Sequence, residues 1–111
     1  MIKIDKNCKV EKNTEPDTDT AGTYLQDWIE VDYNTLLNTF GKPNGCGDGY
    51  KVQAEWIIET PDGVATLYDY KMGDCYNGEG QGIRVEEVID WHIGGYTKGV
   101  VDWIKKVLGI H

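Results

Sequence analysis

The sequence lacks most of what nucleic-acid binding requires. Arg84 is its only arginine, and 19 Asp and Glu outnumber 11 Lys and Arg, which gives a formal net charge of −8 in 111 residues. Because nucleic-acid binding takes its affinity from neutralised phosphates, this balance argues against direct nucleic-acid binding and favours a basic partner. The alternative interpretation is that this charge only keeps a small protein soluble.

Cysteine and histidine are too few and too scattered for a metal or disulfide scaffold. Cys8, Cys46 and Cys75 are odd in number, irregularly spaced and without a CxxC pair, and only two histidines accompany them. We therefore expect reduced, incidental thiols. The acidic pair Asp17 and Asp19 is no calcium loop, because an alanine stands where a third ligand is needed. No metal and no cofactor are expected.

Long apolar runs are also missing. None approaches the about 20 residues that span a membrane, and the N-terminus alternates apolar and charged residues, unlike a signal peptide. These absences predict a soluble, cytoplasmic protein that does not act at a membrane. The length suits one core, so we place an N-terminal extension and polar linker at residues 1–22 and a single α+β domain at residues 23–111.

Residues 50–71 (YKVQAEWIIETPDGVATLYDYK) combine strand alternation with turn chemistry. Trp56 and Ile58 fall on one face of an extended strand, with Glu55 on the other. The tetrapeptide TPDG supplies a tight turn with Gly63 in the left-handed region. The return strand divides into one face with Thr66, Tyr68 and Tyr70 and another with Ala65, Leu67, Asp69 and Lys71.

Two helices are predicted from apolar residues at helical spacing. Asp32 caps the first helix and Gly41 ends it, while Thr97 caps the second and Gly109 ends it. The apolar stripes consist of Tyr33, Leu36, Leu37 and Phe40 in the first helix and of Val100, Val101, Ile104, Val107 and Leu108 in the second.

Two further strands flank this hairpin. Residues 23–31 form a strand that we expect to be central, and another strand starts at Val88 and is broken by Gly94 and Gly95. Residues 2–10 are compatible with a short edge strand. In the strand at residues 23–31, alternation assigns one face to Leu25, Ile29 and Val31 and the other to Tyr24, Gln26, Trp28 and Glu30.

The predicted fold class is α+β: a mostly antiparallel sheet in the order β-α-β-β-β-α, optionally with an extra N-terminal strand. Two helices pack on one face of this sheet. Because the opposite face then needs cover, we expect a homo-oligomer, most simply a dimer.

The segment WHIGG, at residues 91–95, is one candidate site. Gly94 and Gly95 bring bare backbone to a helix N-terminus, where unpaired N–H groups attract an anion, and Lys98 adds charge. The alternative is a strand-to-helix elbow in which glycine serves only the turn.

Three other groups of residues are weaker candidates. Rings at Tyr68 and Tyr70, together with Trp28 and Trp56, suit stacking on a flat ligand or core packing. His92 is a candidate base, although no spacing supports a nucleophile at Cys75 or an acid at Asp69 or Asp90. An acidic set is either a solvated face or a phosphate-like surface, and it consists of Glu55, Glu59, Asp62, Glu86, Glu87 and Asp90.

Six short segments together resemble small proteins of tailed-phage genomes that usually carry no assigned activity. The segments are TYLQ (23–26), FGKP (40–43), DGYK (48–51), AEW (54–56), ATLYDYK (65–71) and WHIGG (91–95). The resemblance covers residues 23–108 and carries over no catalytic residues. It implies a context, because short phage accessory proteins often bind host immune components or sequester nucleotide-derived immune signals.

Three functions remain open, and the first is favoured because the WHIGG elbow offers a physical place for an anion. It is a phage-type, non-enzymatic counter-defence protein that sequesters a nucleotide-derived immune signal. The second is an acidic inhibitor of a host nucleic-acid-handling immune protein such as a CRISPR effector, and the third is a small hydrolase using His92. The predicted ligand-binding residues are Trp56, Tyr68, Tyr70, Lys71, Arg84, Trp91, His92, Gly94, Gly95 and Lys98.

Overall fold

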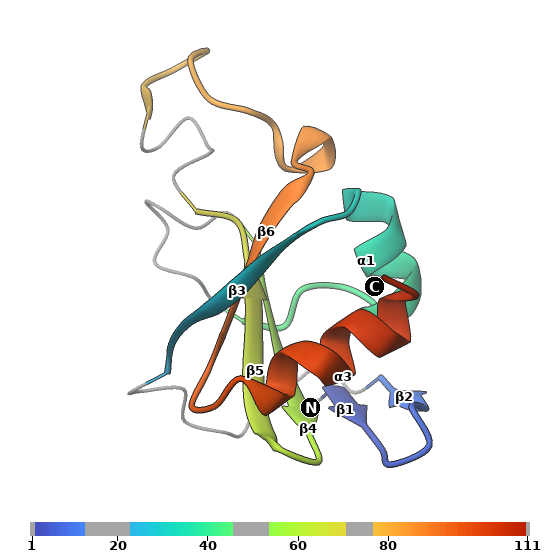
Figure 1. Cartoon of the computed structure of the whole chain (residues 1–111). Helices are drawn as coiled ribbons and strands as arrows, with labels where there is room; N and C mark the ends of the chain where they lie inside the picture. Colours follow the sequence, from blue (N-terminus) through green and yellow to red (C-terminus); the bar gives the residue numbers. More distant parts are fainter. Residues whose placement is uncertain (1, 13–22, 46–53, 71–76, 111) are drawn as a thin grey trace.

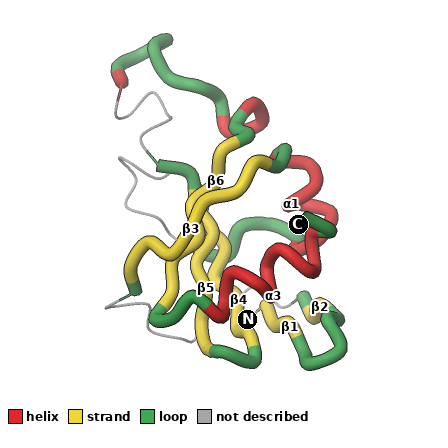
Figure 2. The backbone as a smooth tube through the Cα atoms, in the orientation of Figure 1, coloured by secondary structure: helices red, strands yellow, loops and turns green. Residues whose placement is uncertain are grey.

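Two helices cover one face of a single sheet (Figures 1 and 2). The structure is a computed structural model that describes residues 2–12, 23–45, 54–70 and 77–110. Its elements in chain order are β1 (Ile2–Ile4), β2 (Val10–Glu11), β3 (Tyr24–Glu30), α1 (Tyr33–Phe40), β4 (Glu55–Thr60), β5 (Gly63–Tyr68), the 3₁₀ helix η1 (Val85–Glu87), β6 (Asp90–Gly95) and α3 (Gly99–Leu108). The predicted α+β class is confirmed.

The sheet runs in the order β2-β1-β4-β5-β6-β3. Every neighbouring pair is antiparallel except β1 and β4, which are parallel, so the sheet is mixed. The expectation of a central strand at residues 23–31 is wrong, because β3 pairs only with β6 among the described strands and lies at the edge.

The N-terminal residues belong to the same sheet. Ile2 and Ile4 are only 1% and 3% exposed and lie in the main apolar core. Residues 2–11 therefore form two strands of the domain rather than an extension outside it, which corrects the predicted boundary. The polar linker predicted at the end of that extension falls largely on residues 13–22, outside the described residues.

The predicted hairpin is present as β4 and β5. Thr60 and Gly63 pair across the turn, and the Thr60 hydroxyl donates to the Gly63 carbonyl at 2.7 Å. Gly63 has a φ of +114°, a conformation that favours glycine. The preceding turn residue, Asp62, accepts a 2.8 Å hydrogen bond from the Trp103 indole and so ties the hairpin to α3.

The two helices end as predicted, but the second begins later. The Asp32 carboxylate accepts the Thr35 N–H at 3.3 Å, and hydrogen bonds from Thr35 lower the pKa of that carboxyl. Gly109 ends α3 in the left-handed conformation. The predicted cap at Thr97 is wrong, because α3 starts at Gly99 and Lys98 occupies its cap position. No helix among the described residues has the length and apolar character needed to cross a membrane.

Three rings form the centre of the core on the helix side. Trp56 and Trp91 are fully buried and meet edge to face, with centroids 5.4 Å apart, and Tyr33 stacks on Trp91 at 6.1 Å. The Trp56 indole donates to the Gly41 carbonyl and the Trp91 indole to the Val31 carbonyl, both at 2.9 Å. Because these carbonyls flank α1, the two indoles hold both ends of that helix on the sheet.

We predict that Trp91→Phe lowers the free energy of unfolding by about 2–4 kcal/mol, because it leaves a cavity and an unpaired carbonyl at Val31. Trp103→Phe is the matched control, since its hydrogen bond to Asp62 lies near the surface, and it should cost less than about 1 kcal/mol. Urea unfolding followed by circular dichroism measures both. Equal losses would contradict the central role given to Trp91.

Candidate functional site

Four side chains form a straight line across the face of the sheet that bears no helix. Trp28 on β3 lies opposite His92 on β6, His92 lies opposite Tyr68 on β5, and Tyr68 lies opposite Glu55 on β4. Directly opposed residues on antiparallel strands point to the same side of a sheet. We call this set the cross-strand row; with strands about 4.8 Å apart it spans about 14 Å.

The register separates this row from the core. The neighbours of its members along β4, β5 and β6 are Trp56, Leu67, and the pair Trp91 and Ile93, all with no exposed surface. Since successive residues of a strand point to opposite sides, the cross-strand row faces away from the two helices.

Three rings touch one another at the row. The His92 ring lies 5.5 Å from Tyr68 and 5.4 Å from Tyr70, and the two tyrosine rings are 6.4 Å apart. All three residues are half-buried, whereas the neighbouring Trp28 is 61% exposed. The result is a packed ring cluster with an accessible indole beside it.

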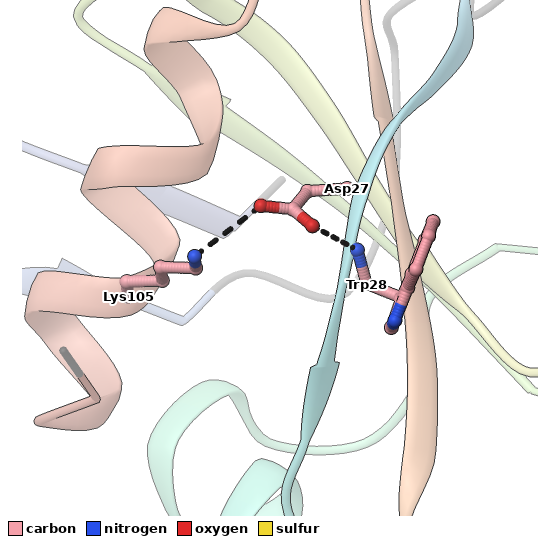
Figure 3. A network of polar contacts seen from close by, with 3 residues as sticks. All are labelled: Asp27, Trp28 and Lys105. Carbon is pink, nitrogen blue, oxygen red and sulfur yellow. Dashed lines mark hydrogen bonds and ion pairs between the residues drawn. The ribbon is translucent and has the colours of Figure 1, made fainter.

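A β-bulge in β3 fixes the direction of Trp28. The register shifts between Leu25 and Asp27, so that Asp27 lies opposite the buried Ile93 while Trp28 lies opposite His92. The Asp27 carboxylate accepts the Trp28 N–H at 2.8 Å and binds Lys105 Nζ of α3 at 3.3 Å, and its side chain points away from that of Trp28 (Figure 3). The Trp28 N–H, helped by Lys105, lowers the pKa of Asp27.

The bulge also corrects the predicted faces of β3. Leu25 was expected beside Ile29, but it lies opposite Gly94 on the helix-free face and is 46% exposed. Tyr24 lies opposite Gly95, away from the face that carries Trp28. The extra residue of the bulge exchanges the two faces for the residues of β3 that precede it. A constant period of two therefore cannot describe this strand.

Acidic groups dominate the electrostatics of the row. Burial lowers the pKa of His92, and the opposing influences come from Asp90 and Asp69. Burial raises the pKa of Tyr68, with Tyr70 and Glu55 adding to the shift. His92 is therefore mainly neutral at pH 7 and lies in a negative local field.

The next cross-strand pair adds to this field. Glu30 lies opposite Asp90, two residues along each strand from Trp28 and His92, and so on the same face. Glu30 is exposed and Asp90 is half-buried.

The structure brings together only part of the predicted ligand set. Tyr68, Tyr70 and His92 meet on the helix-free face, and Lys71 lies outside the described residues. Trp56 and Trp91 have no exposed surface, so their prediction as ligand-binding residues is corrected: both are core.

The predicted anion site at the glycines is also wrong. Gly94 and Gly95 lie inside β6, paired with both β3 and β5, and not at a helix N-terminus. A Cβ on Gly95 would lie 2.7 Å from Val100 Cγ2 of α3, and one on Gly94 would collide with the Thr66 hydroxyl. These glycines serve close packing on both faces of the sheet.

The two predicted phosphate-binding cations are not brought together. Arg84 precedes η1, before β6 begins, and its ion pair with Glu86 is 3.7 Å long and exposed. Lys98 follows the other end of β6, and the six residues of that strand alone span about 16 Å.

The predicted acidic set is likewise dispersed. Asp62 binds the Trp103 indole, Glu59 pairs with Lys3 at 3.6 Å, and Glu86 and Glu87 lie in η1. Only Glu55 and Asp90 adjoin the ring cluster. No group of three His, Cys, Asp or Glu suited to a metal ion occurs in the part of the chain that the structure describes. Cys46 and Cys75 lie outside that part, so a partner for His92 at Cys75 stays untested.

Trp28 is the residue of this face that the predicted ligand set omits. Its place opposite His92 depends on the pairing of β3 with β6, which are about 60 residues apart in the chain, and on the bulge. The sequence did group Trp28 with Tyr68 and Tyr70 as rings suited to stacking, but it gave no reason to place Trp28 opposite His92. Comparisons with protein-family models, with curated proteins and with solved structures find no match to this chain.

We predict that His92 titrates below 6.5, its ordinary value, because burial outweighs the nearby acids. The folded state then binds this proton less well than the unfolded chain, so the free energy of unfolding falls as the pH drops below about 6.5. Imidazole NMR and urea unfolding between about pH 7 and pH 5 measure the two effects. His92→Gln should reduce the fall in stability, and a His92 pKa above 6.5 would show that Asp90 and Asp69 dominate instead.

Proposed function

We propose that the protein is a non-enzymatic binding protein that covers a basic protein surface with its helix-free face. The cross-strand row carries this proposal, because it joins an exposed indole and a ring cluster to a border of carboxylates. Aromatic side chains supply contact area at the centre of protein interfaces. Complementary charge at the border speeds association and selects basic partners.

The kind of partner follows from the charge. Surfaces that normally bind nucleic acid are basic, and a chain with a net charge of −8 is attracted to them. Together with the phage-like segments, this favours the acidic inhibitor of a host nucleic-acid-handling immune protein, such as a CRISPR effector. Binding of this kind excludes the nucleic acid by occupying its surface.

The nucleotide-sequestering function has weaker support. The ring cluster suits a base, but Gly94 and Gly95 are closed into the sheet and Arg84 and Lys98 lie beyond opposite ends of β6. A phosphate placed at the row would meet Glu55 and Asp90 rather than cations among the described residues. The geometry therefore favours a protein partner over an anionic small molecule.

A second copy of the chain is another way to cover the helix-free face, as the expected homo-oligomer requires. Two faces that each carry Glu30 and Asp90 repel one another across a symmetric contact. A basic partner has no such cost, and we favour it for that reason. Light scattering of the wild type and of Trp28→Ala distinguishes these cases.

The test uses purified CRISPR effector complexes of several types, each assayed for target-DNA binding with the protein added. We predict that at least one is inhibited and that Trp28→Ala and Glu30→Lys each weaken the inhibition about tenfold or more, as interface hot spots do. Inhibition should also weaken with added salt. Glu87→Lys makes the same charge change on exposed η1 and should have little effect.

Two results would count against this function. Equal inhibition by Trp28→Ala and the wild type would place the contact elsewhere on the molecule. Calorimetric binding of cyclic oligonucleotides, lost in the same variant, would instead restore the nucleotide-sequestering function.

A further inference from the structure

The cross-strand row has the composition of a site for a single cationic group. At its β3 end the exposed Trp28 ring lies opposite His92, and the acidic pair Glu30 and Asp90 follows on the same face. A cation over an aromatic face is attracted by the ring quadrupole, and a nearby carboxylate adds a charge-assisted hydrogen bond.

Among the described residues, no lysine or arginine influences the titration of His92 or Tyr68. The charged groups that act on His92 and Tyr68 are Asp90, Asp69 and Glu55, all acidic. Lys105 is bound to Asp27 on the helix side of β3, and Lys3 is paired with Glu59.

The opposite side of the molecule provides an internal comparison. There the Lys106 ammonium lies 5.2 Å from the centre of the Trp103 ring, so that indole already has a cation from its own helix. Trp28 is the more exposed indole, and no described cation lies over it. Among the described residues, the two tryptophans thus differ in whether a cation of the chain fills this contact.

We propose that the cross-strand row binds a cationic side chain of the partner, an arginine above all, as the anchor of the interface. The guanidinium is planar and weakly hydrated, so it stacks on an indole while donating to carboxylates at its edge. The row provides the ring at Trp28, and the next cross-strand pair provides acids on the same face at Glu30 and Asp90. This inference rests on the proposed function, whose partner surface is basic.

The test uses small probes and the whole protein. N-acetyl-arginine amide is titrated while the NMR signals of the Trp28 indole and the His92 and Tyr68 rings are followed, and the neutral citrulline analogue is the matched ligand. We expect saturable shifts at the row with the arginine probe and none with the citrulline probe. Trp28→Leu should weaken binding about fivefold, the usual worth of a cation–π contact.

Tyr24→Leu is the matched protein control, because Tyr24 is 62% exposed on the same strand but lies away from the row. It should leave arginine binding unchanged. Equal binding of the two probes would overturn the proposal in favour of uncharged stacking. Absence of shifts at the row with the arginine probe would overturn it outright.

The outcomes also separate this inference from the proposed function. If the arginine probe does not bind while Trp28→Ala still relieves effector inhibition, the arginine anchor is wrong and the proposed inhibitor function stands. If the probe binds at the row while Trp28→Ala leaves effector inhibition unchanged, the row does bind arginine but the proposed inhibitor function is wrong.

Discussion

The arrangement of this protein depends on two buried indole hydrogen bonds. Trp56 and Trp91 reach the carbonyls of Gly41 and Val31, which flank α1, and they pack against each other and against Tyr33. An indole N–H buried without a partner is costly, so these bonds fix which face of β4 and β6 meets the helices. The alternation of the strands then sends every second residue to the other face, where the cross-strand row forms.

The residues of the motif WHIGG serve both faces of β6 in this arrangement. Trp91 belongs to the core, His92 belongs to the helix-free row, and the glycines let α3 and the side chains of β5 approach β6. A Cβ on Gly94 would also lie 3.5 Å from the Tyr68 ring. One short strand thereby supplies the core on one face and the binding surface on the other.

Local signals predicted the hairpin, both helix C-termini, the division of β4 and β5 into two faces and the apolar stripe of α3, because turn chemistry and periodicity act within a few residues. The edge position of β3, the strands of residues 2–11 and the bulge before Trp28 depend on partners far away in the chain. For the same reason the sequence grouped Trp56 with Tyr68, although only the register shows that they face opposite sides. The ring cluster of Tyr68, Tyr70 and His92 was therefore predicted only in part.

Two tryptophans can report directly on whether binding takes place on the helix-free face. Trp28 is exposed on that face, and Trp103 lies on α3 on the opposite side. Hydroxyl-radical footprinting of the protein alone and in complex with an inhibited effector compares the oxidation of the two indoles. If the helix-free face is the binding surface, we expect strong protection of Trp28 with unchanged oxidation of Trp103. Protection of Trp103 with Trp28 still reactive would contradict it.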